Sequence, residues 1–90
     1  MSRTIHKYPL SMAGVQTVHL PDGAEILHVA PQRNMVCLWA LVNPESAKVP
    51  RYILIAGTGH VVQEGPHLEH LGTFMLNDGA LVFHAFEVMQ

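Results

Sequence analysis

Tight-turn signals constrain how this chain can fold more than any other feature of its sequence. Pro21-Asp22-Gly23 combines a residue with a fixed φ, a side chain that bonds its own backbone, and a glycine that accepts positive φ. Asn77-Asp78-Gly79 lies between two apolar runs, which is a strong hairpin signal, and Gln32-Arg33-Asn34 is a third tight connection. The pieces between these turns are too short to predict an amphipathic helix, so they predict strands.

The turns predict an all-β fold in a single domain, residues 1–90. Consecutive strands on either side of each turn are expected to pair as antiparallel neighbours, which gives a meander. The segment 43–50 contains two prolines and is expected to be an exposed loop. The spacing leaves room for one short helical turn near 66–70. The expected strands cover residues 3–8, 15–20, 25–31, 35–42, 51–56, 71–76 and 80–88.

Two of these strands are apolar on both faces. Within 35–42, one face carries Met35, Cys37, Trp39 and Leu41, and the other carries four aliphatic residues; 80–88 is similar. Hydrophobic residues make up 49% of the 90 residues and charged residues only 13%, which is more apolar surface than one small sheet can cover. We therefore expect a small antiparallel sandwich or partly open barrel of about six or seven strands that forms a homo-oligomer. The strand 3–8 contains Lys7 and suits a sheet edge.

Charge and composition exclude several classes of function. The net charge of −2 lacks the cationic excess that nucleic-acid binding requires, so no nucleic-acid partner is expected. The longest apolar stretch, 35–42, is far shorter than the roughly 20 residues that span a bilayer, so no membrane association is expected. The single Cys37 cannot form an intramolecular disulfide, and no secretory signal is recognisable, so the expected location is the cytoplasm.

No enzymatic site is expected. Burial in an apolar strand makes the Cys37 thiol inert, and the serines have no glycine elbow or adjacent base, so we predict neither catalysis nor a cofactor. The seven histidines raise the question of a metal site. His60, His67 and His70 lie close together in sequence, but His67-Leu68-Glu69-His70 gives only an i, i+3 pair where catalytic zinc motifs use i, i+4. No metal is therefore expected, and a small metal-dependent hydrolase is a less favoured alternative.

A glycine-rich segment, Gly57-Thr58-Gly59-His60, is the main candidate for ligand binding. Its backbone N–H groups could surround an anion, although its glycines could equally serve only to provide unusual dihedral angles. His84, flanked by Phe83 and Phe86, is expected to be a hydrogen-bonded core or pocket residue. The ligand-binding residues expected from these arguments are Arg51, Gly57, Thr58, Gly59, His60, His67, His70, Thr73 and His84.

Seven short segments spread over nearly the whole chain form a combined pattern: Lys7-Tyr8-Pro9-Leu10, Gln16-Thr17-Val18, Leu20-Pro21-Asp22-Gly23-Ala24, Cys37-Leu38-Trp39-Ala40-Leu41-Val42, Gly57-Thr58-Gly59-His60, Leu71-Gly72-Thr73-Phe74 and Gly79-Ala80-Leu81-Val82-Phe83-His84. This pattern resembles a family of small phage and prophage proteins of unknown function. The resemblance implies a phage setting, in which accessory proteins without catalytic motifs often act by binding.

Two functions follow from this setting by analogy. The first is sequestration of a small phosphorylated nucleotide immune signal in pockets of a homo-oligomer, in the cytoplasm of the infected host cell. The alternative is inhibition of a host defence complex by protein–protein contact, as anti-CRISPR proteins do, and an exposed Trp39 or Tyr52 would favour it because aromatic residues anchor interfaces. A structural role in the virion is also open.

Overall fold

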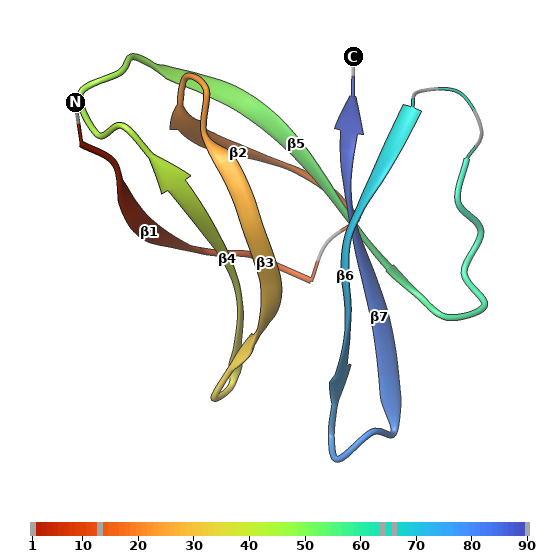
Figure 1. Ribbon diagram of the computed structural model, residues 1–90. Coiled ribbons are helices and arrows are strands. Elements are labelled where there is room, and N and C mark those ends of the chain that lie inside the picture. The colour runs from red at the N-terminus through yellow and green to blue at the C-terminus, as the bar shows by residue number, and fades with distance from the viewer. Residues whose placement is uncertain (1, 13, 64, 66, 90) are drawn as a thin grey trace.

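The computed structural model describes residues 2–12, 14–63, 65 and 67–89, and the fold is all-β (Figure 1). None of the described residues lies in a helix, and so none forms a helix that could cross a membrane. The seven strands are β1 (Thr4–Pro9), β2 (Val15–Pro21), β3 (Glu25–Gln32), β4 (Met35–Val42), β5 (Lys48–Gly57), β6 (His67–Leu76) and β7 (Leu81–Met89).

The strands form two antiparallel sheets that pack as a small sandwich. The three-stranded sheet has the order β1-β4-β3, and the four-stranded sheet has the order β2-β5-β7-β6. Leu20, Val29, Leu38, Val42 and Ile53 fill the space between them with 0% exposure. β3 and β6 contact each other without forming a ladder, so the sheets do not close into a barrel. The core therefore agrees with the predicted sandwich.

The predicted meander is wrong at the Pro21-Asp22-Gly23 turn. The turn exists, but β2 and β3 lie in different sheets, and β2 pairs with β5 instead. Leu20, Pro21 and Ala24 are buried, and the Asp22 N–H donates to the Ala47 carbonyl at 2.8 Å. The turn therefore carries the chain across the core from one sheet to the other. The β3–β4 and β6–β7 hairpins and the edge position of β1 agree with prediction.

Two boundaries also differ from the sequence-based expectation. Lys48, Val49 and Pro50 belong to β5 rather than to the predicted loop, because they pair with the buried end of β2. The predicted helical turn near 66–70 is wrong over residues 67–70, which start β6 and pair with the end of β7. Residue 66 lies outside the described residues.

β4 is buried on one face and only partly covered on the other. Val36, Leu38, Ala40 and Val42 are buried against the four-stranded sheet. On the opposite face Cys37 is buried and Trp39 and Leu41 are half-buried, but Met35 is exposed. The expected double burial is therefore incomplete in the single chain.

Candidate functional site

The turn after β5 folds a histidine ring back onto the backbone. The Gly57 N–H donates to Nδ1 of His60 at 3.2 Å, and the His60 N–H donates to the Gly57 carbonyl at 3.0 Å. A Cβ on Gly57 would lie only 2.8 Å from Cε1 of that ring, so a side chain at this position would displace the ring. Gly59 has φ of +89°, a conformation that also favours glycine. Gly57 therefore leaves room for the His60 ring, and Gly59 provides the backbone conformation of the turn.

The backbone bond assigns the tautomer of His60. Because Nδ1 accepts a hydrogen bond from the Gly57 N–H, the ring is neutral in this arrangement and its proton is on Nε2. His60 is exposed, so it presents one N–H donor from a ring that the backbone holds in place.

A second feature is a row of hydrogen-bonded side chains that starts at the same turn. Thr58 Oγ1 lies 2.7 Å from Nε2 of His84, and Nδ1 of His84 lies 3.0 Å from Oγ1 of Thr73. Thr73 Oγ1 in turn lies 3.0 Å from Nε2 of His70. The row thus joins the turn after β5, the middle of β7 and the middle of β6, and His84 is the hydrogen-bonded residue that its apolar strand predicted.

A β-bulge in β6 brings His70 into this row. Thr73 pairs directly with His84 and His70 pairs with Phe86, with a register shift between His70 and Gly72. In a regular strand, residues three apart point to opposite faces, whereas a bulge adds one residue and restores a shared face. His70 and Thr73 therefore point the same way, and the His70 ring lies 5.4 Å from that of Phe86.

The row can be polarised in two directions. The Thr58 hydroxyl can donate to the Val82 carbonyl at 3.4 Å, in which case His84 donates to Thr58, Thr73 donates to His84, and His70 donates to Thr73. In the reverse arrangement Thr58 donates to His84, His84 donates to Thr73, and Thr73 donates to His70. Both leave every member satisfied, so the row can present His70 Nε2 either as a donor or as an acceptor.

A pocket of about 340 Å³ opens beside the turn. This volume is within the range of small-molecule sites, about 300–1,000 Å³. Three predicted ligand-binding residues line the pocket, and Thr58 connects it to the row of Thr73, His70 and His84. The lining residues are Gly57, Thr58, His60, Ala80, Leu81, Val82 and Phe83.

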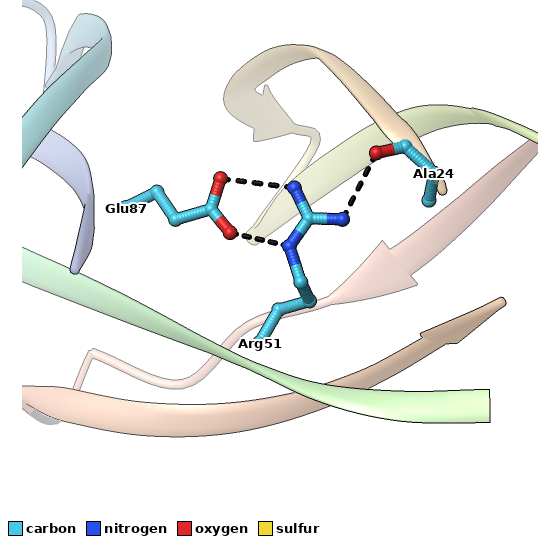
Figure 2. Close-up of polar contacts among 3 residues, drawn as sticks. All are labelled: Ala24, Arg51 and Glu87. Carbon is cyan, nitrogen blue, oxygen red and sulfur yellow. Dashed lines mark hydrogen bonds and ion pairs between the residues drawn. The ribbon is translucent and has the colours of Figure 1, made fainter. Parts of the chain in front are cut away.

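Arg51 and His67 lie apart from this cluster. Arg51 donates from Nη2 to Oε1 of Glu87 at 3.0 Å, from Nε to the other carboxylate oxygen, and from Nη1 to the Ala24 carbonyl at 2.9 Å (Figure 2). The hydrogen bond with Glu87 raises the pKa of the Arg51 guanidinium, outweighing the opposing effect of burial. His67 pairs with Met89 and, by strand alternation, points to the opposite face from His70.

Sequence reasoning missed the role of Glu87. Its carboxylate is the buried partner of Arg51, yet the two residues are 36 positions apart and lie on strands whose pairing the turns did not predict. A lone acidic residue in the apolar run of β7 was the available signal. Among the described residues, no group of three or more His, Cys, Asp or Glu side chains could hold a metal ion.

Comparison with curated proteins and with solved structures finds no match. One protein-family model does match, and it covers residues 1–90. The chain therefore belongs to the family described as "Domain of unknown function (DUF7352)".

Proposed function

We propose that the protein is a binding module that sequesters a small phosphorylated nucleotide at the Gly57–His60 turn of a homo-oligomer. The observation that carries this proposal is the ring of His60, which a backbone hydrogen bond holds with its Nε2–H free to donate beside a pocket of about 340 Å³. The Thr58 hydroxyl adds a second polar group at the same wall. Phosphate oxygens can accept from the His60 Nε2–H, and a ribose hydroxyl can donate to the Thr58 oxygen, whose own hydrogen is donated to Val82 or His84.

The rest of the pocket suits the apolar surface of a base. Leu81, Val82 and Phe83 line it, and a few oriented polar groups on a mainly apolar wall are typical of ligand sites. The row from His84 to His70 holds the Thr58 oxygen in place, because His84 is hydrogen-bonded to that oxygen in either polarisation of the row. A preorganised polar group costs less ordering entropy when the ligand binds.

Self-association is supported by the outer face of the four-stranded sheet, on which Lys48, at the first position of β5, is the one Asp, Glu, Lys or Arg among the described strand residues. By register and alternation, this face consists of Val15, Thr17, His19, Pro21, Lys48, Pro50, Tyr52, Leu54, Ala56, Leu68, His70, Thr73, Met75, Val82, His84, Phe86 and Val88. Exposed faces of antiparallel sheets are normally polar. Strand spacing gives it about 500 Å² per copy, so two copies would bury about 1,000 Å², the lower limit for a specific interface.

The resemblance to phage and prophage proteins supports a host immune nucleotide as the ligand. The alternative function is a blocker that acts by protein–protein contact. An exposed Trp39 or Tyr52 would favour this alternative. Both side chains are half-buried, so this criterion lends the alternative no support.

Ligand binding is tested by calorimetric titration with a panel of cyclic and ADP-ribose-type nucleotides. We expect at least one to bind with a Kd below the micromolar range, and Thr58→Val to weaken it about fivefold, because one hydrogen bond contributes about 1 kcal/mol. Thr4→Val, the same change on an exposed residue of β1, is the matched control. Absence of heat with every nucleotide would contradict the proposal.

Self-association is tested by sedimentation. The wild type is expected to form a dimer or larger species at micromolar concentration, and Leu54→Glu to shift it to monomer by placing a charge in the apolar face. Leu27→Glu, on an exposed leucine of the other sheet, should leave the assembly unchanged. A strictly monomeric wild type would refute the shared interface.

A further inference from the structure

A second pocket, of about 320 Å³, lies at the tip of the β3–β4 hairpin on the outer face of the three-stranded sheet. Two of the chain's five cationic Lys and Arg residues line it, and no carboxylate does. The pocket beside Gly57–His60 contains neither a Lys nor an Arg. The lining residues are Lys7, Gln32, Arg33, Asn34, Met35 and Cys37.

The two cationic side chains have no acidic partner within the described part of the chain. Arg3 lies 3.9 Å from Glu25, and Arg51 is paired with Glu87, but neither Lys7 nor Arg33 forms an ion pair there. Lys7 Nζ donates instead to the neutral Gln32 amide oxygen at 2.7 Å. Like charges that line one pocket repel each other, and a bound anion would offset this repulsion.

The backbone of Arg33 provides an independent observation. Its φ is +57°, whereas the other described non-glycine residues with positive φ are Asn77 and Asp78. Asn and Asp tolerate this conformation because their short polar side chains bond locally, but a long side chain such as that of Arg gains no such compensation. Hairpin turns favour Asn or Gly at such positions. A strained residue at the rim of a pocket is a typical sign of a functional side chain.

An aromatic surface adjoins the cationic pocket. Trp39 pairs directly with Lys7 across β1 and β4 and is half-buried, with its ring stacked on that of His28 at a centroid distance of 6.3 Å. Met35, a wall of the pocket, is 54% exposed. The face therefore places apolar surface next to two cations.

We propose that this pocket binds the phosphate group of a small phosphorylated molecule. The Arg33 guanidinium and the Lys7 ammonium pair with the phosphate oxygens, and the side-chain amides of Gln32 and Asn34 donate to those that remain. An aromatic group attached to the phosphate would reach Met35 and Trp39. The site is on the other sheet from Gly57–His60 and does not depend on the ligand proposed there.

The test uses the single tryptophan, Trp39, as a fluorescence probe. Inorganic pyrophosphate and ADP are each titrated into the full-length protein, and amide shifts of residues 32–35 in ¹H–¹⁵N spectra are a second readout. We expect saturable binding of both probes, with ADP binding more tightly because its base contacts the apolar surface. Lys7→Gln and Arg33→Gly should each weaken binding at least tenfold.

Two controls separate this site from general electrostatic attraction and from misfolding. Lys48→Gln removes one charge from an exposed residue outside the pocket and should change the affinity less than twofold. Arg33→Gly should raise the thermal midpoint while it lowers affinity, because glycine adopts positive φ without strain. The proposal is wrong if Lys7→Gln and Lys48→Gln weaken binding equally, or if millimolar probes shift none of the residues 32–35.

Discussion

The ion pair between Arg51 and Glu87 should contribute a large share of the stability of this small fold. Arg51 connects three segments: its own strand β5, Glu87 on β7, and the Ala24 carbonyl just after the turn between the sheets. The side chains of Arg51 and Glu87 are only 22% and 8% exposed. Glu87→Gln removes the negative charge while it keeps the size and one acceptor oxygen, so it tests the charge and not the packing.

The magnitude follows from what the substitution removes. One charge-assisted hydrogen bond contributes about 1.5–3 kcal/mol, and partial exposure of Arg51 places the expected loss at about 2 kcal/mol. For a domain of this size, each kcal/mol lowers the thermal midpoint by about 4–8 °C. Glu87→Gln should therefore lower Tm by about 8–16 °C, measured by circular dichroism at neutral pH.

The chain contains a matched control for this measurement. Arg3 and Glu25 are 3.9 Å apart and their side chains are 51% and 63% exposed, so Glu25→Gln should cost less than about 0.5 kcal/mol. Replacing both buried partners, as Arg51→Met with Glu87→Leu, should recover much of the loss because no unpaired charge remains. Equal effects of Glu87→Gln and Glu25→Gln would refute the argument that burial makes the inner pair important.

Two further predictions concern single positions. Gly57→Ala should displace the His60 ring, which lies 2.8 Å from the position of the added Cβ, and weaken nucleotide binding in calorimetry by at least tenfold; an unchanged affinity would show that this ring position is not needed. Burial raises the pKa of the Tyr8 phenol, so in Tyr52→Phe, where Tyr8 is the only tyrosine, ultraviolet absorbance should show ionisation above the ordinary pKa of about 10. Because the folded-state pKa is the higher one, this group's contribution to stability is complete below about pH 10 and is lost as pH rises through the folded pKa; ionisation at or below the ordinary value would contradict this.

The strands and two of the hairpins were predictable because they depend on local rules. Asn77-Asp78-Gly79 between apolar runs predicted the β6–β7 hairpin, and the apolar residues of 35–42 predicted burial of β4 on both faces, of which one is fully buried. The partner of β2 was not predictable in this way. Pro21-Asp22-Gly23 specifies that the chain turns, but the choice between pairing and crossing depends on the burial of Leu20 and Ala24 in the finished core.

The candidate site was predictable in composition but not in arrangement. The glycine-rich segment indicated Thr58 and His60, which line the pocket, and the alternative explanation, an unusual dihedral angle, applies to Gly59 but not to Gly57. Arg51 was grouped with these residues because it is close in sequence. Alternation along β5 places it on the core face, opposite to Thr58, where Glu87 satisfies its charge.

The bulge at His70 and Gly72 explains why the row of side chains could not be read from spacing alone. In a helix, two residues three positions apart, such as His70 and Thr73, point to the same face. In a regular strand they point to opposite faces, so a β interpretation would separate the two side chains. The extra residue in β6 reverses this and aligns both with His84 on β7. Gly72 lets β6 approach β3 at the same point, since a Cβ there would lie 3.3 Å from the Val29 carbonyl oxygen. The irregularity that lets the two sheets pack closely is therefore also the one that brings His70 into the row with Thr73 and His84.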